Sequence, residues 1–148
     1  PLQITSDVHR VTNEMLTLIV RSFTGQDFST MTYCAVGDGA DAGSNPSPND
    51  TDLQHEVDRI NVIFESGGGA LSIDGTTFYS VANFSKNMEP CTATESGIFD
   101  RDRPGEGAPD VNTIDDRMGE HSIFQDEVEH EKGANAIGVT TTIFFCAS

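Results

Sequence analysis

The sequence predicts a single mainly β domain across residues 1–148, a β-sandwich or small barrel with one N-terminal α-helix. Two observations predict this fold class. Several short runs rich in β-branched and aromatic residues are separated by turn residues, and only one segment has apolar residues at helical spacing. The chain length and the 36% apolar content allow one modest hydrophobic core. The intervals between the predicted strands do not favour βαβ units.

One helix is predicted, over residues 8–23. Apolar residues recur there at intervals of three and four, which places them on one face of a helix. These residues are Val8, Val11, Met15, Leu18 and Ile19. Gly25 is expected to end the helix, and the apolar face is expected to pack against a sheet.

Strands are predicted in most of the remaining chain. The predicted segments are 31–36, 58–66, two runs within 70–84, 94–100 and 136–148. The pair Asp74-Gly75 predicts a hairpin turn between the two runs within 70–84. In the C-terminal segment, alternation places the apolar residues on one face. They are Ile137, Val139, Ile143 and Phe145.

Two further segments have other patterns. Residues 101–119 are polar, with proline and glycine at intervals, and are predicted to form a long exposed loop. Residues 121–133 fit either a strand that leads into an acidic turn or a short helix, and the strand is preferred.

The strongest feature of the composition is its acidity. Eight Lys and Arg face 24 Asp and Glu, so the net charge is −16. Because nucleic acids and anionic lipids are bound through clustered Lys and Arg, we expect neither nucleic acid nor membrane as a partner. Two interpretations of the acidity stay open: a soluble protein kept apart by self-repulsion, or a protein of a halophilic host. No apolar run is long enough to span a membrane and no secretory signal is visible, so we expect synthesis in a host cytoplasm.

Three cysteines occur, and none belongs to a C-x-x-C pair. Cys34 and Cys146 lie in strand-like apolar runs, where a thiol is expected to be buried as a small apolar group. One intramolecular bridge among Cys34, Cys91 and Cys146 is the alternative.

The stretch from Tyr33 to Arg59 resembles a ligand-binding loop. Gly37, Gly39 and Ala42 form a G-x-G-x-x-A pattern directly after a predicted strand, which is typical of dinucleotide sites. Such a site requires a helix that begins at the glycines, yet two prolines follow within the next six residues. The neighbouring aspartates would also repel phosphate. A nucleotide site is therefore not predicted.

A calcium site is the next hypothesis for this stretch. The spacing does not fit an EF-hand, but calcium accepts six to eight oxygens in loose geometry, so an irregular site is a candidate. Its candidate ligands are Asp38, Asp41, Asp50 and Asp52, with Asn49 beside them. The alternative is a solvated acidic loop. No cofactor other than calcium is suggested.

No enzyme is predicted. The four histidines have no spacing typical of a metal motif and are expected on the surface; they are His9, His55, His121 and His130. No G-x-S-x-G pattern is present. A glycosidase pair of carboxylates stays open only because carboxylates are so numerous.

The order of short motifs along the chain resembles a family of small virion proteins from tailed double-stranded DNA viruses. Members of that family are tail-collar fibre, tail or capsid-decoration proteins. The motifs are VTNEML (11–16), YCAVGDG (33–39), NDTDLQHEVDR (49–59), TESGIFD (94–100) and VTTTIFF (139–145). They occur in the family's order between residues 11 and 145, so the match extends over most of the chain. The chain departs from the pattern in the long segment 101–119, in the acid-rich residues 125–133, and in Cys34, where an aliphatic residue is usual.

The resemblance implies a structural subunit of a virus particle, located in the virion as a capsid decoration or turret, or in the neck or tail. Its partners would be other virion proteins and further copies of itself, with a trimer expected. Together with the acidity, it makes a virus of a haloarchaeal host one interpretation. No catalytic or cofactor-binding residue carries over. The second function hypothesis is a receptor- or glycan-binding tail-fibre domain with calcium-stabilised acidic loops.

The resemblance also implies a structural role for the stretch from Tyr33 to Arg59. Val36 would end a core strand, and Gly37 and Gly39 would permit the tight turn after it. Leu53 and Val57 would face the core.

Overall fold

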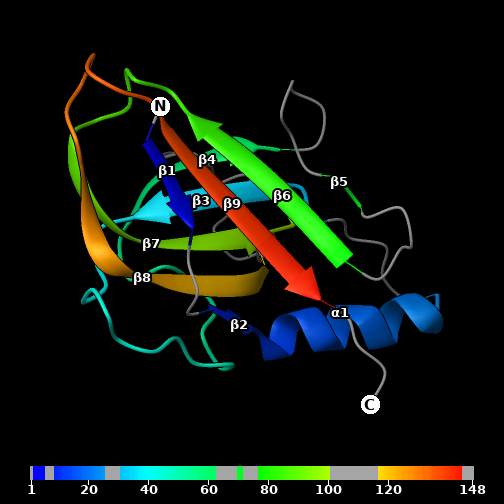
Figure 1. Cartoon of the computed structure of the whole chain (residues 1–148). Coiled ribbons are helices and arrows are strands. Elements are labelled where there is room, and N and C mark those ends of the chain that lie inside the picture. The colour runs from blue at the N-terminus through cyan, green and yellow to red at the C-terminus, as the bar shows by residue number, and fades with distance from the viewer. Residues whose placement is uncertain are drawn as a thin grey trace, which may run out of the picture.

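The computed structural model describes residues 2–5, 9–25, 31–62, 70–71, 77–100 and 117–144. Two sheets face each other, and one helix lies beside them (Figure 1). The predicted mainly β class, with a sandwich-like arrangement and one N-terminal helix, is confirmed. No helix among the described ranges is long and apolar enough to cross a membrane.

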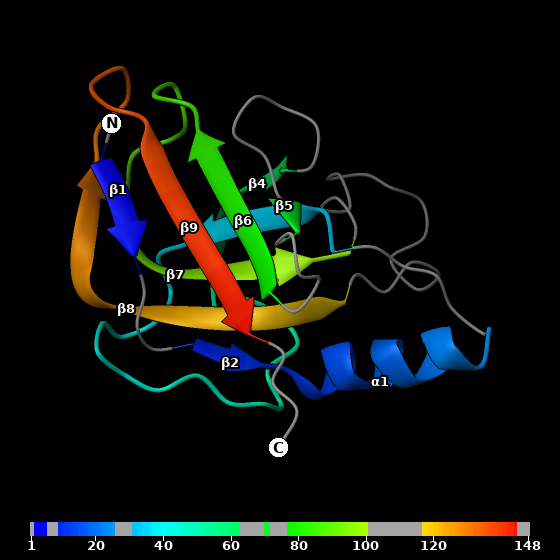
Figure 2. The ribbon, with the colours of Figure 1, turned by 45° about the vertical axis from the view of Figure 1, so that its right-hand side comes forward.

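The first sheet has the strand order β1-β9-β6-β5, and the second has the order β2-β8-β7-β3-β4. The strands are β1 (Leu2–Thr5), β2 (His9–Val11), β3 (Tyr33–Gly37), β4 (Glu56–Asn61), β5 (Ala70–Leu71), β6 (Thr77–Phe84), β7 (Cys91–Phe99), β8 (Met118–His130) and β9 (Ile137–Phe144). The pair β1–β9 is parallel, and the other described pairs are antiparallel. In Figure 2 the long strands β6 and β9 cross over β7 and β8 at a steep angle.

The hydrophobic core lies between the two sheets. Each strand alternates its side chains between two faces, so one face of each sheet supplies the core. The second sheet contributes Cys34, Val36, Ile98 and Phe124, and the first contributes Ala82, Phe84, Ile137 and Val139. The predicted inner face of the C-terminal strand is confirmed for Ile137, Val139 and Ile143. Phe145 lies outside the described residues, as does Cys146.

The prediction that a helix spans residues 8–23 is wrong at its start. Helix α1 runs from Asn13 to Phe23, and His9–Val11 forms strand β2, paired with β8. Thr12 separates the two elements, because its backbone is extended and its Oγ1 accepts the N–H of Met15 at 3.2 Å. The Thr12 N–H meanwhile donates to Gly119 O at 3.1 Å, which holds the preceding residues on the sheet.

The end of the helix agrees with the prediction. Gly25 has φ +72°, a conformation that glycine adopts without a steric penalty. Its N–H donates to Ser22 O at 3.2 Å, and the Thr24 N–H donates to Arg21 O at the same distance.

The other predicted boundaries differ by a few residues. The prediction of a strand within residues 121–133 is confirmed by β8, which begins earlier, at Met118. The predicted loop 101–119 is therefore wrong at its last two residues, because Met118 pairs with Phe99 in the sheet; residues 101–116 lie outside the described part. The predicted hairpin turn at Asp74-Gly75 also lies outside it, while the flanking strands β5 and β6 pair antiparallel. Strand β4 begins two residues before the predicted 58, and residues 63–66 are not described.

Candidate functional site

The loop between β3 and β4 is held to the outer face of the second sheet by one buried carboxylate, Glu95. Val36 pairs with Ser96, and both side chains lie on the inner face. Glu95 precedes Ser96 in β7, so its side chain points to the outer face. Glu95 is fully buried nevertheless, because the loop covers it. Its carboxylate accepts the backbone N–H groups of Gly39 (3.3 Å), Gln54 (3.1 Å) and His55 (3.1 Å).

A histidine from the neighbouring strand completes the arrangement. His121 on β8 is buried, and its Nε2 lies 2.9 Å from Glu95 Oε2. Its Nδ1 lies 2.7 Å from Asp50 Oδ2, and the same Asp50 oxygen accepts the Ser47 N–H at 2.7 Å. We call Asp50, His121 and Glu95 the carboxylate–histidine row. It joins the middle of the loop and its two ends to two adjacent strands.

The surroundings of His121 and Glu95 favour the charged form of each side chain. Burial lowers the pKa of His121, but the hydrogen bonds to Glu95 and Asp50 outweigh this and leave the pKa above its ordinary value. Burial likewise raises the pKa of Glu95, yet the hydrogen bonds from His121, His55 and Gln54 bring it below its ordinary value. In its protonated form, His121 donates from both ring nitrogens and keeps no lone pair for a metal ion or for a proton abstracted from a substrate.

The two glycines of the G-x-G pattern allow the loop to approach the sheet. A Cβ at Gly39 would lie 2.5 Å from His55 N, and a Cβ at Gly37 would overlap the carbonyl oxygen of His55. Neither glycine has a positive φ, so close backbone contact explains them rather than an unusual turn conformation. The residues that follow form turns and no helix, as expected from the two prolines among them. Leu53 is buried and Val57 packs against the core, as the resemblance implies.

The four aspartates proposed for calcium are not brought together. Asp38 pairs with His55 Nδ1, and Asp50 belongs to the carboxylate–histidine row. Asp41 offers its backbone oxygen to the Ser44 N–H at 3.1 Å, and Asp52 accepts the hydroxyl of its neighbour Thr51 at 3.3 Å. In the described ranges, no group of three or more His, Cys, Asp and Glu could hold a metal ion.

The prediction that all four histidines lie on the surface is wrong for two of them. His121 and His130 are buried, His9 is half-buried and His55 is exposed. Burial of His121 is offset by its two carboxylate partners, and His130 Nε2 lies 3.0 Å from Met88 O. The local signal for His121 is its place in the strand-like run HSIF, but its partners lie 26 and 71 residues away in the sequence.

A second polar group lies between the sheets, on the inner face of β8. Glu120 is fully buried there, accepts the Ser122 hydroxyl on Oε1, and has His9 Nδ1 at 3.8 Å. Its other carboxylate oxygen has no hydrogen-bond partner in the described structure. Burial raises the pKa of Glu120 to about 7, against a smaller lowering by Ser122 and His121. Burial also raises the pKa of the nearby Cys34 thiol, and the Glu120 charge adds to that rise.

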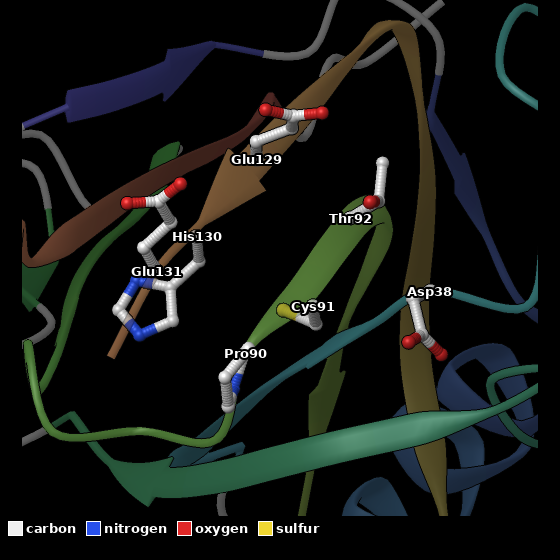
Figure 3. Close-up of a pocket in the computed structure, with 7 residues that line it drawn as sticks. All are labelled: Asp38, Pro90, Cys91, Thr92, Glu129, His130 and Glu131. Atoms are coloured by element: carbon white, nitrogen blue, oxygen red, sulfur yellow. The ribbon is translucent and has the colours of Figure 1, made fainter.

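A shallow pocket of about 460 Å³ opens where the ends of β7 and β8 meet (Figure 3). Its lining is mostly polar: Asp38, Pro90, Cys91, Thr92, Glu129, His130 and Glu131. Burial, and the charge of Asp38, raise the pKa of the Cys91 thiol, so it is protonated at neutral pH and a poor nucleophile. The pocket therefore offers hydrogen-bond acceptors and negative charge, without an activated nucleophile.

No protein-family model, no curated protein and no solved structure matches this chain.

Proposed function

We propose that this chain is a structural subunit of a tailed virus particle, a capsid decoration or turret, or a neck or tail component. It would act in the virion through adhesion to other virion proteins, as a closed oligomer for which a trimer is favoured. The ordered set of five motifs supports the class of protein. The observed fold, with one helix near the N-terminus and strands in two sheets, is compatible with it.

The observation that carries the proposal is that the buried Glu95 carboxylate holds a loop in one position. Both of its oxygens are occupied by donors that fix the loop of residues 38–55 to the sheet. The most elaborate polar site of the described chain thus stabilises a shape, and both ring nitrogens of its histidine already have carboxylate partners. A constant surface is what a subunit needs when many copies must make the same contacts.

The second candidate is a receptor- or glycan-binding tail-fibre domain. The observation in its favour is the shallow pocket, whose three carboxylates are Asp38, Glu129 and Glu131. Carboxylates accept hydrogen bonds from sugar hydroxyls. Retention of labelled glycans on immobilised protein, lost in Glu129→Gln, would favour this candidate over the first.

Two measurements test the structural role. Light scattering in dilute and in molar NaCl is expected to give a mass of about three times 15.9 kDa, at least in the high salt. Mass spectrometry of virus particles purified from the source organism is expected to detect the chain in many copies. Its absence from purified particles would overturn the proposal.

A further inference from the structure

Helix α1 has two apolar faces, and only one of them is used within the chain. Met15 and Leu18 are buried, and Met15 packs beside Gly119 on β8. On the other side, Leu16, Val20 and Phe23 are 53%, 62% and 84% exposed. They are the exposed large apolar side chains of the described chain. We call these three residues the outer stripe.

The outer stripe has the spacing of a helix–helix seam. Its members are separated by four and then three residues, which corresponds to successive d, a and d positions of a heptad. Three such layers span the length of α1, from its first turn to its last residue. Figure 2 shows α1 along one margin of the molecule, with its C-terminal end extending beyond the sheets. The stripe therefore lies on an element that another helix could reach.

The charge distribution indicates which partner fits. The chain has a net charge of −16, but α1 contains one acid, Glu14, and one base, Arg21. These two residues are seven apart and share heptad position b, which lies away from the a and d positions of the stripe. Glu14 moreover accepts the Met118 N–H at 2.9 Å. Two acidic copies can thus meet along this helix without placing carboxylates against each other, whereas an anionic membrane would require several Lys and Arg.

We propose that the outer stripe is the contact between copies of this chain, packing against the same stripe of neighbouring copies at the axis of the oligomer. The number of copies, three, is taken from the proposed function, and the inference rests on it in that respect. Each helix in a parallel trimer supplies one Leu16, one Val20 and one Phe23, so like residues form three apolar layers. The area is small for an interface, so association depends on protein concentration and on salt that screens the remaining charge.

The test compares the full-length chain with Val20→Gln/Phe23→Gln, using sedimentation over a concentration series in molar NaCl. Burying two such side chains contributes enough that their loss is expected to weaken association by about 100-fold or more. Ser22→Gln is the matched control, because Ser22 is exposed on the same helix but outside the stripe. Circular dichroism checks that both variants keep the fold.

Two sedimentation results would overturn the inference: a double variant that associates as strongly as the wild type, or a wild type that is monomeric at every salt concentration. A monomer that sediments with phosphatidylcholine–phosphatidylglycerol vesicles would also overturn it, and would assign the stripe to a membrane. The inference and the proposed function fail separately. If the chain is present in purified particles but the double variant still assembles, only the role of the outer stripe is refuted. If the chain assembles through the stripe but is absent from particles, only the virion role is refuted.

Discussion

Glu95 on β7 and His121 on β8 meet at 2.9 Å on the outer face of the second sheet, beneath a loop that both residues hold. His121 also reaches Asp50 within that loop, while Glu95 accepts backbone N–H groups at its two ends. The loop is thus attached at three points by two side chains. Because the charges are buried and opposite in sign, the removal of one leaves the other without a partner.

Glu95→Gln is expected to lower the free energy of unfolding by about 2–4 kcal/mol, since it replaces one of the two acceptor oxygens with an NH2 donor and removes the counter-charge of His121. Urea denaturation at neutral pH in molar NaCl measures the change. Glu89→Gln is the control: Glu89 pairs with Lys132 at 2.6 Å, but both side chains are exposed, so little change is expected. Equal effects of the two substitutions would contradict the importance of the Glu95 contacts.

His121 is expected to titrate above its ordinary pKa of 6.5 in the folded protein, and Asp50→Asn is expected to lower that pKa. Because the folded pKa is raised, the stability that His121 contributes is fully present below 6.5 and is lost as the pH rises through the folded pKa. Ring proton chemical shifts in NMR follow the titration. Asp41→Asn changes a carboxylate of the same loop that lies outside the carboxylate–histidine row and should leave the midpoint unchanged. A wild-type midpoint at or below 6.5 would contradict the expected rise of the His121 pKa.

Strand identity could be predicted from the sequence, because alternation is local. The inner face of β9 follows from the period of two in residues 137–143, and β3 follows from a short apolar run that ends at a glycine. The start of α1 could not be predicted in the same way. Val8 and Val11 fit the helical spacing, but His9–Val11 pairs with β8, more than a hundred residues away, and that distant pairing decides the structure.

The candidate site could be predicted only in part. Asp38 and Asp50 could be singled out from the sequence as candidate ligands. Their partners His55 and His121, however, lie 17 and 71 residues away. Glu95 has no local signal, because a single acid in a strand is ordinarily solvated. Its role depends on the loop that covers it. Only the folded topology places a buried carboxylate beneath backbone N–H groups from two distant segments.

Glu120→Gln is expected to flatten the decrease of stability with pH. The pKa of Glu120 rises from 4.5 to about 7 on folding, so the folded state binds a proton that the unfolded state releases between these values. Stability therefore falls as the pH rises from 4.5 to 7, by about 3 kcal/mol in total. The groups around Glu120 are Ser122 and His121 on β8, His9 on β2 and Cys34 on β3.

The free energy of unfolding is measured by denaturation between pH 5 and 6.5. In this range the other two groups interfere least: the stability contributed by His121 is lost above it, and the stability contributed by Glu95 is lost below 4.5. Glu129→Gln, on an exposed part of the same strand, should keep the slope of the wild type. If Glu120→Gln also keeps the slope of the wild type, the pH dependence belongs to other groups.

Gly39→Ala is expected to destabilise the protein by about 1–3 kcal/mol, since the added Cβ would lie 2.5 Å from His55 N and must displace one of the two backbones. Hydrogen exchange of the His55 amide, which donates to Glu95, should become faster in this variant. Gly43→Ala is the comparison: it introduces a side chain at φ +78°, where the added Cβ would make only an ordinary contact with Gln125 O at 3.9 Å, so it strains the backbone without disturbing His55. Equal acceleration of exchange in both variants would count against the close-contact explanation.

Salt is expected to raise the thermal stability of the protein strongly. The sixteen excess negative charges repel one another around a small core, and at molar salt the screening length falls to about 3 Å, so that only adjacent charges still interact. The thermal midpoint should therefore rise steadily from dilute buffer to molar NaCl. Sucrose at matched osmolality is the control, because it favours the compact state through exclusion from the surface but does not screen charge. If the midpoint is the same in dilute buffer and in molar NaCl, or if sucrose reproduces the whole increase, charge repulsion does not limit the stability of this fold.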